Sequence, residues 1–292
     1  DLNILRKFID WTPFFNSWQL RGKYPEILKD EIVGVEAQKL FDDGQVILDR
    51  IVNENWLTAT AVIGFFPANS VNDDDIEVYT DESRSEVSHT LRNLRQQRQK
   101  APGQANFCLT DFIAPKESGV KEYGGSFAVT AGGNIEQWVK KFEEELDDYN
   151  AIMTKALADR LAEAFAECMH EQVRKLHWGY DKTESLNNDE LIKERYVGIR
   201  PAPGYSACPE HTEKRTLFEL LDAEAQTGIM LTESCAMYPA ASVSGWYFSH
   251  PESKYFGLGN IEKDQVENYA QRKGMHREEA ERWLMPVLNY DI

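Results

Sequence analysis

The sequence predicts a single α+β domain in which helices flank a mostly antiparallel sheet. Short runs rich in β-branched and aromatic residues are bounded by turn formers, and longer stretches carry apolar residues at helical spacing. The 292 residues contain no internal repeat, low-complexity tract or clear linker, which favours one continuous domain. With 42% hydrophobic and 28% charged residues, the chain has the composition of an ordinary globular protein with a sizeable core.

Helices and strands are predicted to alternate along the chain. The segments with helical spacing are 25–40, 46–52, 134 to about 178 with a break near 147–150, 214–226, 263–273 and 277–285. The segments with strand composition are 58–66, 75–80, 106–113, 125–130, 243–248 and 255–259. Two antiparallel hairpins are expected, 58–66 with 75–80 and 243–248 with 255–259. The aromatic segment 8–15 is too short and too limited by its proline to be predicted as a helix.

The residue types at several segment ends support these boundaries. Pro25 suits the first turn of a helix. Asn134 followed by Gln137 has the spacing of a capping box. Gly228 and Gly274 are typical of positions just beyond a helix C-terminus, so they are expected to end the helices before them.

Charge, hydropathy and cysteine content exclude several classes of protein. A net charge of −17 repels phosphate backbones, so no nucleic-acid partner is expected. The longest apolar run, 59–68, is far shorter than the roughly 20 residues that span a bilayer, so no membrane segment is expected. The four cysteines are widely spaced without a CxxC pair, which indicates neither a disulfide framework nor a zinc site. Because the sequence begins with Asp1 and has no apolar leader, we expect a fragment of a larger cytoplasmic chain.

The most informative segment is a loop rich in proline and glycine, Gly198 to His211, with the sequence GIRPAPGYSACPEH. Its prolines and glycines exclude a helix or a central strand and predict a rigid loop. A rigid loop that presents Arg200 and Tyr205 suits a small zwitterion, because it is ordered before the ligand binds. The alternative, a crossing loop whose arginine pairs with a neighbouring carboxylate, fits the spacing equally well. Cys208 and His211 have CxxH spacing, but without a second pair of ligands we expect no metal here.

A second candidate feature is a pair of carboxylates, Asp159 and Glu163, in a predicted alanine-rich helix. The i, i+4 spacing places both on one helix face, where like charges repel and another group must compensate them. That group is either a bound cation, such as a sulfonium or an amino group, or an arginine of the protein. The residues alone favour the arginine.

The segment 245–256, GWYFSHPESKYF, is dense in aromatic residues. Aromatic faces suit a purine ring or a cation, but alternating aromatic residues in a strand are more often part of a core. No Walker loop, GxGxxG motif or Ser-His-Asp order can be placed on suitable elements of this chain.

Together these segments resemble the activation domain of cobalamin-dependent methionine synthase. The loop RPAPGY, continuing into ACPEHTEK, is similar to the signature of that family. Three other segments resemble the family in the same order along the chain, namely DWTPFF (10–15), ALADRLAEA (156–164) and SVSGWYFSHP (242–251). The resemblance covers almost the whole chain. It departs from the family pattern at Ser206, where proline is expected, and a looser loop there is expected to change the affinity.

The resemblance implies a helmet- or C-shaped domain over residues 1–292, one module of a larger chain, that binds S-adenosylmethionine. In that family the domain caps the cobalamin module, and inactive cob(II)alamin is reactivated with a methyl group from S-adenosylmethionine and one electron from flavodoxin or a related flavoprotein reductase. The full enzyme transfers methyl from methyltetrahydrofolate to homocysteine in methionine biosynthesis. Cobalamin is expected on a neighbouring module and zinc only in another module. The isolated chain is expected to bind without turnover.

The resemblance also implies the ligand contacts. Arg200 is expected to pair with the methionyl carboxylate, because a guanidinium fork suits a planar carboxylate, and Asp10 is expected to hold the amino group. The full set of expected S-adenosylmethionine contacts is Asp10, Arg200, Ala202, Gly204, Tyr205, Tyr255 and Phe256, the last two bordering the adenosyl portion. The expected sources of negative potential near the sulfonium are Asp159, Glu163 and Glu194. No catalytic residue is expected, because the nucleophile belongs to the cofactor.

The electron donor raises a question of charge, because flavodoxins are acidic and so is this chain. Two basic runs are hypothetical docking sites for it, Arg92, Arg95, Arg98 and Lys100, and a smaller one of Arg174 and Lys175. A solvated helix face explains them more simply. Two other functions stay open. One is a stand-alone S-adenosylmethionine-dependent methyltransferase, for which the chain lacks a Gly-rich first turn, and the other is a non-enzymatic S-adenosylmethionine-sensing module.

Overall fold

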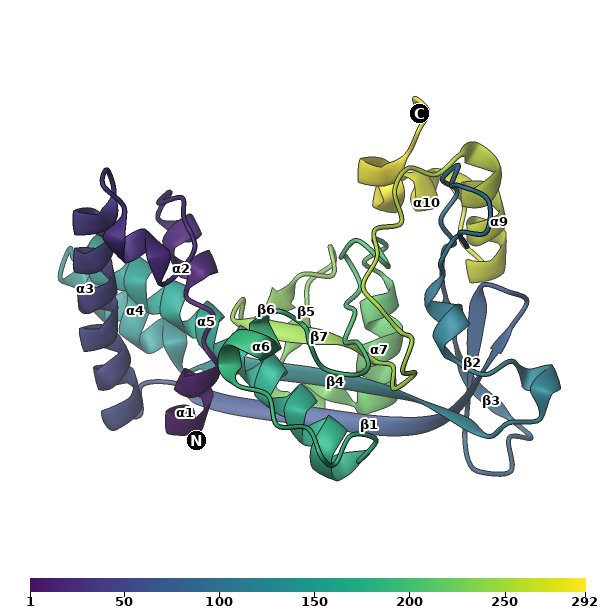
Figure 1. Ribbon diagram of the computed structural model, residues 1–292, viewed down its shortest axis with the longest axis horizontal. Helices are drawn as coiled ribbons and strands as arrows, with labels where there is room; N and C mark the ends of the chain where they lie inside the picture. The colour runs from purple at the N-terminus through teal and green to yellow at the C-terminus, as the bar shows by residue number, and fades with distance from the viewer.

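Two long antiparallel strands form the base on which the rest of the chain is arranged. In the computed structural model, which describes residues 1–292, β1 (Thr58–Val71) pairs with β4 (Glu122–Gly133), with Phe65 opposite Gly125. The five-stranded sheet has the order β3-β2-β1-β4-β7, and every neighbouring pair is antiparallel. Its other strands are β2 (Asp75–Tyr79), β3 (Val87–Arg92) and β7 (Ser242–Tyr247). Helices rise at both ends of the β1–β4 ribbon, so the molecule is C-shaped (Figure 1).

The helices at one end form the N-terminal arm and enclose the largest core. This arm contains α3 (Gly34–Asn53), α4 (Ile135–Glu144) and α5 (Asp148–Gln172). Its hydrophobic cluster has 26 buried residues, among them Trp56, which stacks on Trp138 with ring centroids 4.3 Å apart. The helix α5 is long enough to continue from this arm toward the middle of the sheet (Figure 1).

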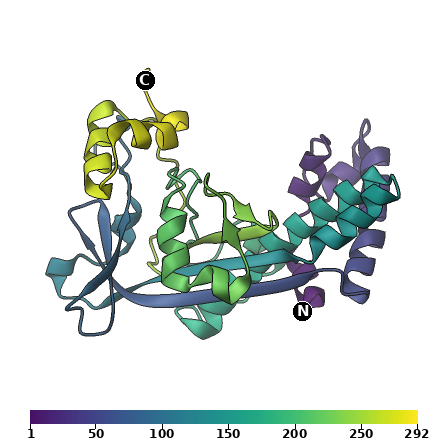
Figure 2. The same ribbon diagram turned by 180° about the vertical axis from the view of Figure 1, so that it is seen from behind.

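The opposite arm is built by the C-terminal helices α9 (Lys263–Lys273) and α10 (Arg277–Leu284). They pack on each other around a separate core of eight buried residues that includes Tyr269 and Leu284. Seen from behind, this arm lies above β2 and β3, at the end of the β1–β4 ribbon away from α3 (Figure 2). The arm is attached there by Arg272, whose guanidinium bonds the buried Asp75 of β2 and the Asn93 carbonyl oxygen.

The two faces of the sheet are covered by different helices. Ala128 and Trp246 point to the face covered by α7 (Glu213–Leu221), whereas Phe127 and Tyr247 pack with residues of α5. This alternation is the period-2 pattern of a strand buried on both sides. The remaining helices and strands are α1 (Leu2–Leu5), α2 (Thr12–Ser17), α6 (Asn188–Ile192), α8 (Ala223–Thr227), β5 (Met230–Leu231) and β6 (Met237–Tyr238). The 3₁₀ turns are Arg6–Phe8, Glu26–Lys29, Leu109–Phe112, Lys116–Ser118 and Met285–Val287, and Val173–His177 is a π-helical turn.

Most of the predicted elements are confirmed. The single antiparallel α+β domain, the β1–β2 hairpin, the strand at β4, the break before α5 and the pair α9 and α10 all form. The turn of the hairpin is at 72–74, because β1 continues beyond its predicted end at residue 66 to Val71. Gly228 ends α8 as expected, with a left-handed φ of 77°. No helix has both the length and the apolar character needed to cross a membrane.

Several predictions for the helical segments are wrong. Residues 12–17 do form a helix, because Pro13 lies in its first turn, where a missing N–H costs nothing, and Phe14 and Phe15 are buried. The predicted helix 25–40 is interrupted, because the Asp30 carboxylate accepts hydrogen bonds from the backbone of residues 32 and 33. α3 then runs through Gly44, which lies against Phe14.

Asn134 does precede α4, but the predicted capping box does not form. Asn134 has a left-handed φ of 68°, and its side chain donates a hydrogen bond to the Thr58 hydroxyl at 3.0 Å. The predicted helix 214–226 is divided at Asp222, which also has a left-handed φ, of 48°. In both places a residue in the left-handed region changes the direction of the chain, which the apolar spacing did not indicate.

Two predicted strands are absent, and three strands, β3 and the short β5 and β6, were missed. Segment 106–113 forms a 3₁₀ turn, because the Asp111 carboxylate accepts the Cys108 N–H at 2.9 Å. Segment 255–259 forms no strand, and the predicted hairpin with 243–248 is wrong because β7 pairs with β4. The strand β3 was not predicted, although its alternating residues extend the β1–β2 hairpin.

Candidate functional site

The proline-rich loop is held along the edge of the sheet. Ile199 and Phe248 exchange two backbone hydrogen bonds of 3.0 Å, and the Pro201 carbonyl oxygen accepts the Trp246 N–H at 2.8 Å. Because β7 is the edge strand, the loop adds to the sheet where its prolines need not donate to a further strand. The expected rigid loop is therefore present, and its backbone continues the sheet.

The other side of the loop is held by segment 255–258. The Tyr255 hydroxyl accepts the Arg200 N–H at 3.0 Å, and the Leu258 N–H donates to the Ser206 carbonyl oxygen at 2.7 Å. Ser206, where the resemblance led us to expect proline, thus has its carbonyl group fixed by a backbone hydrogen bond. The loop lies between two segments that are distant in sequence, and this fixes the position of Arg200.

Cys208 and His211 support the inner side of the loop. The Cys208 thiol donates to the Ala202 carbonyl oxygen at 2.9 Å, and the Gly204 N–H donates to the Cys208 carbonyl oxygen at 2.8 Å. Gly204 has a φ of 93°, and a Cβ there would lie 2.4 Å from the His211 ring, so only glycine fits. The CxxH spacing is explained by these contacts.

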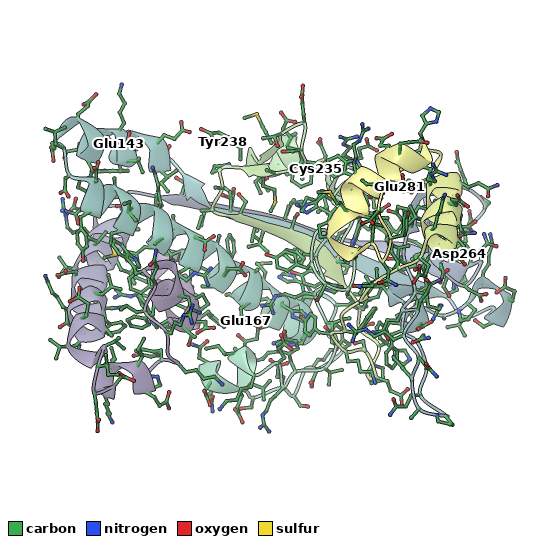
Figure 3. The ribbon with its side chains drawn as sticks, turned by 90° about the horizontal axis from the view of Figure 1, so that it is seen from above. Glu143, Glu167, Cys235, Tyr238, Asp264 and Glu281 are labelled. Atoms are coloured by element: carbon green, nitrogen blue, oxygen red, sulfur yellow. The ribbon has the colours of Figure 1, made fainter.

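A cavity of about 330 Å³ opens beside the loop, where the N-terminal segment, α5, α6 and Arg200 meet. Four of the predicted ligand residues line it, namely Asp10, Glu163, Glu194 and Arg200. These come from segments up to 190 positions apart, and the fold brings them together. Its other charged or phenolic lining groups are Arg160, Glu167 and Tyr196. Glu167 lies on the part of α5 that reaches the middle of the molecule (Figure 3).

Arg200 is the most heavily bonded side chain of this cavity. Its Nη1 lies 2.8 Å from the Glu167 carboxylate, 3.1 Å from the Tyr196 hydroxyl and 3.5 Å from Nδ1 of His170. The Tyr196 hydroxyl is in turn 3.1 Å from that of Tyr255. Because a guanidinium only donates hydrogen bonds, His170 accepts at Nδ1. Its other ring nitrogen, Nε2, lies 3.3 Å from the Tyr180 hydroxyl. The pairing of Arg200 with a protein carboxylate, one of the two interpretations of the loop, is therefore observed.

The cavity carries an excess of negative charge. Four carboxylates line it, those of Asp10, Glu163, Glu167 and Glu194, and only two guanidinium groups face them. Burial raises the pKa of Glu163 above its usual range, and burial likewise raises the pKa of Glu194. The field of Arg200 opposes both shifts without cancelling them. A site of this kind suits a ligand that has a cationic group for the carboxylates and a carboxylate of its own for Arg200.

Asp159 lies outside this cavity. It is bonded to Arg160 at 2.5 Å and lines a separate cavity of about 540 Å³. Glu143 and Tyr238, which Figure 3 labels, also line this cavity. An arginine of the protein therefore compensates the charge of Asp159, as the sequence favoured over a bound cation.

The remaining predicted contacts differ in their positions. Tyr205 is 62% exposed and free to contact a ligand, whereas Ala202 is buried and its carbonyl group is already bonded. Tyr255 is bonded to Arg200 and so borders the site. Phe256 packs against Phe107, with ring centroids 6.0 Å apart, in the core beneath α7.

Glu167, Tyr196 and His170 were missed by the sequence analysis. For Glu167 a signal was present, because it continues the i, i+4 series of Asp159 and Glu163 by one further turn. Tyr196 and His170 gave no comparable signal. Their positions depend on how α5 and the segment before the loop approach each other.

The larger basic run does not form the expected helix face, whereas Arg174 and Lys175 lie in the π-helical turn that continues α5. Arg92 pairs with Asp75 at 2.8 Å, and Arg95 pairs with both Asp74 and Asp111. Residues 93–100 contain no helix. In the smaller run, Arg174 is completely buried and bonded to Glu184, so the hypothesis that it contacts a partner is wrong. Internal ion pairs explain most of these basic residues.

Comparison with known proteins gives consistent matches over nearly the whole chain. Residues 1–274 match the family model described as vitamin B12 dependent methionine synthase, activation domain. A solved structure described as the MetH reactivation domain bound to AdoHcy is 59% identical. The match covers 100% of this chain and 89% of that chain, with a TM-score of 0.95.

Proposed function

The chain belongs to the family of activation domains of vitamin B12-dependent methionine synthase, and we propose from this that it binds S-adenosylmethionine and serves to reactivate the cobalamin of that enzyme. The solved relative holds AdoHcy, the product that S-adenosylmethionine leaves after losing its methyl group. One observation in this chain carries the proposal: Arg200 and four carboxylates meet in a single cavity. S-adenosylmethionine requires such a combination, because it has a carboxylate beside an ammonium and a sulfonium.

The charges of the cavity suggest one orientation of the ligand. The methionyl carboxylate is assigned to Arg200, and the ammonium to Asp10. Glu163 and Glu194 supply negative potential for the sulfonium, and Asp159 contributes from the next turn of α5. The loop residues Ala202, Gly204 and Tyr205 border the ligand, with Tyr255 and Phe256 assigned to the adenosyl end. Phe256 is the weakest of these assignments, because its ring packs into the core.

The residues of this domain position the methyl donor and supply no nucleophile. Cobalamin, carried by a neighbouring module, would supply the metal centre for the chemistry, which consumes one electron from the donor and the methyl group of the sulfonium and leaves the neutral thioether. The carboxylates favour the sulfonium before transfer more than the neutral thioether after it, so they favour binding of the reactant over the product. Arg200 and Asp10 hold the part of the ligand that does not react.

The partners proposed for this domain are the cobalamin module of the same chain and a flavodoxin or related flavoprotein reductase, in the cytoplasm. The basic runs give weak support for donor docking, because Arg92 and Arg95 are already paired. Arg98 is exposed and has no ion pair, so it is a better position than Arg92 or Arg95 for a charge reversal to glutamate. Unchanged and equally salt-sensitive flavodoxin binding in such a variant would exclude this site.

Two measurements test the proposed function. Calorimetry with S-adenosylmethionine and S-adenosylhomocysteine is expected to show binding to the isolated chain. A methyl-transfer assay is then expected to require the cobalamin module and an electron donor. Turnover by the chain alone would favour a stand-alone methyltransferase, and binding without any contribution to reactivation would favour a sensing module. Absence of binding would contradict all three functions.

A further inference from the structure

We propose that Glu167 is a positioning residue, which holds the Arg200 guanidinium so that one edge stays available for the ligand carboxylate. Glu167 is not one of the residues for which the family resemblance implied a contact. The inference rests on the proposed function, because it concerns how the same cavity selects a ligand that has a carboxylate. Its evidence is the pattern of bonds around Arg200.

All side-chain bonds of Arg200 use the same nitrogen atom. Nη1 contacts Glu167, Tyr196 and His170, whereas Nε and Nη2 have no protein partner. A guanidinium presents its donors in a fixed planar fork, so fixing Nη1 at one corner also fixes the direction of the opposite edge. That edge still has donors for a carboxylate, and Arg200 itself lines the cavity.

Glu167 is itself fixed in position. It lies within the long helix α5, its side chain is only 9% exposed, and its second carboxylate oxygen has no hydrogen-bond partner. That oxygen lies 4.0 Å from Arg174, which is completely buried and bonded to Glu184. One carboxylate thus lies between two guanidinium groups, so its negative charge stabilises both.

A competing explanation predicts the opposite effect. If Glu167 only occupied Arg200 in place of the ligand, its removal would release the guanidinium and increase affinity for the ligand carboxylate. If Glu167 positions Arg200, its removal lets the fork turn toward other acceptors, and affinity falls. The loss should then depend on the carboxylate of the ligand, because Glu167 acts through Arg200.

The test compares two ligands in the variant Glu167→Gln. S-adenosylhomocysteine carries the carboxylate, and its decarboxylated analogue lacks it but keeps the amine, the thioether and the adenosyl group. We expect affinity for S-adenosylhomocysteine to fall about tenfold and affinity for the analogue to change by less than about twofold. The matched control is Glu171→Gln, one turn further along α5, where the glutamate pairs only with Lys175 near the surface. It should leave both affinities unchanged.

A second variant keeps the inference testable if Glu167→Gln does not fold. Tyr196→Phe removes one hydroxyl from Nη1 and leaves the ring, and it should cause a smaller loss restricted to the carboxylate ligand. Circular dichroism and thermal unfolding establish that each variant is folded. Unchanged or tighter binding of S-adenosylhomocysteine in a folded variant would overturn the positioning role, as would equal losses for both ligands. Failure of the wild-type chain to bind either ligand would contradict the proposed function itself.

Discussion

Pro201 and Gly245 are in direct contact where the proline-rich loop joins the edge of the sheet. A Cβ on Gly245 would lie 2.6 Å from the Pro201 carbonyl oxygen, which also accepts the Trp246 N–H at 2.8 Å. A separation of that size is below van der Waals contact, so the loop can reach β7 only where the strand has no side chain. The position of Arg200, next to Pro201, therefore depends on a glycine in a strand.

Replacing this glycine should move the loop. In Gly245→Ala the new methyl group would meet both the Pro201 carbonyl oxygen and the Phe127 ring. We expect a loss of about 1–3 kcal/mol in the free energy of unfolding, together with weaker binding of S-adenosylmethionine. Urea unfolding and calorimetry measure the two effects. Gly124→Ala is the matched control, because a Cβ there lies 3.6 Å from Ala68, an ordinary contact. Equal affinity in the two variants would contradict the prediction.

The guanidinium fork of Arg200 should matter more than its charge. Arg200→Lys keeps a positive charge but replaces the planar fork by a single ammonium group. We expect affinity for S-adenosylmethionine to fall by at least about tenfold, roughly 1.4 kcal/mol, and to fall further in Arg200→Ala. Both variants should remain folded, with some loss of stability because the buried Glu167 loses a partner. Wild-type affinity in a well-folded Arg200→Ala protein would refute the assigned role.

The raised pKa values of Glu163 and Glu194 predict a dependence of ligand selection on pH. Burial raises both pKa values above the ordinary 4.5, so these groups become protonated at a higher pH in the folded protein than in the unfolded chain. Between the pKa values of the unfolded and the folded chain, the folded state binds more protons than the unfolded state. The free energy of unfolding without ligand therefore falls as pH rises through this range. A bound cation favours the ionised carboxylates, so affinity for the sulfonium should fall as pH is lowered toward these pKa values.

Calorimetry at about pH 7 and about pH 5 tests this dependence. S-adenosylhomocysteine has the same carboxylate and amine but a neutral sulfur, so it corrects for effects that do not involve the sulfonium. We expect the preference for S-adenosylmethionine over S-adenosylhomocysteine to decrease at the lower pH. Glu163→Gln should reduce this change, because it removes one of the two titrating groups. A preference that is the same at both pH values would exclude these carboxylates as its source.

The sequence was sufficient to predict most of the fold, because periodicity reports which residues are buried locally. It predicted β4 and the pair α9 and α10, whose apolar residues keep a regular spacing. It was wrong for segment 255–259, which has the composition of a strand but no strand partner. There the Tyr255 hydroxyl bonds the Arg200 backbone, and a contact between distant segments leaves no periodic signal.

The candidate site could be predicted only in part for the same reason. The prolines and glycines of the loop indicated a rigid segment around Arg200, and the carboxylates of α5 indicated an unusual charge. Tertiary packing brings these residues together with Asp10 and Glu194 in one cavity. In the sequence, only the family resemblance indicated that they belong to one site. Glu167 was overlooked although its spacing was visible, because a third carboxylate in the series resembles an ordinary polar helix face.

The C-terminal arm should depend on one lysine that faces two buried carboxylates. Lys273 of α9 bonds Glu210, at the end of the proline-rich loop, and lies 2.8 Å from Glu213 of α7. Burial alone would raise the pKa of Glu210, but Lys273 and the two hydrogen bonds from Thr212 together outweigh burial, and the pKa is lowered. Lys273→Met should leave both carboxylates without their cation and cost about 3 kcal/mol in the free energy of unfolding.

Urea unfolding of this variant and of Lys263→Met, an exposed lysine on the same helix, measures the effect. The paired Glu210 has a lowered pKa, so its stabilising contribution is present above the unfolded pKa and is lost as pH falls through the folded one. The difference between Lys273→Met and the wild type should therefore shrink in acid, where the carboxylates become neutral. Adding Glu210→Gln to Lys273→Met should restore part of the stability, because it removes one unpaired buried charge. If the double variant is no more stable than Lys273→Met, the loss comes from packing around the lysine and the charge explanation is wrong.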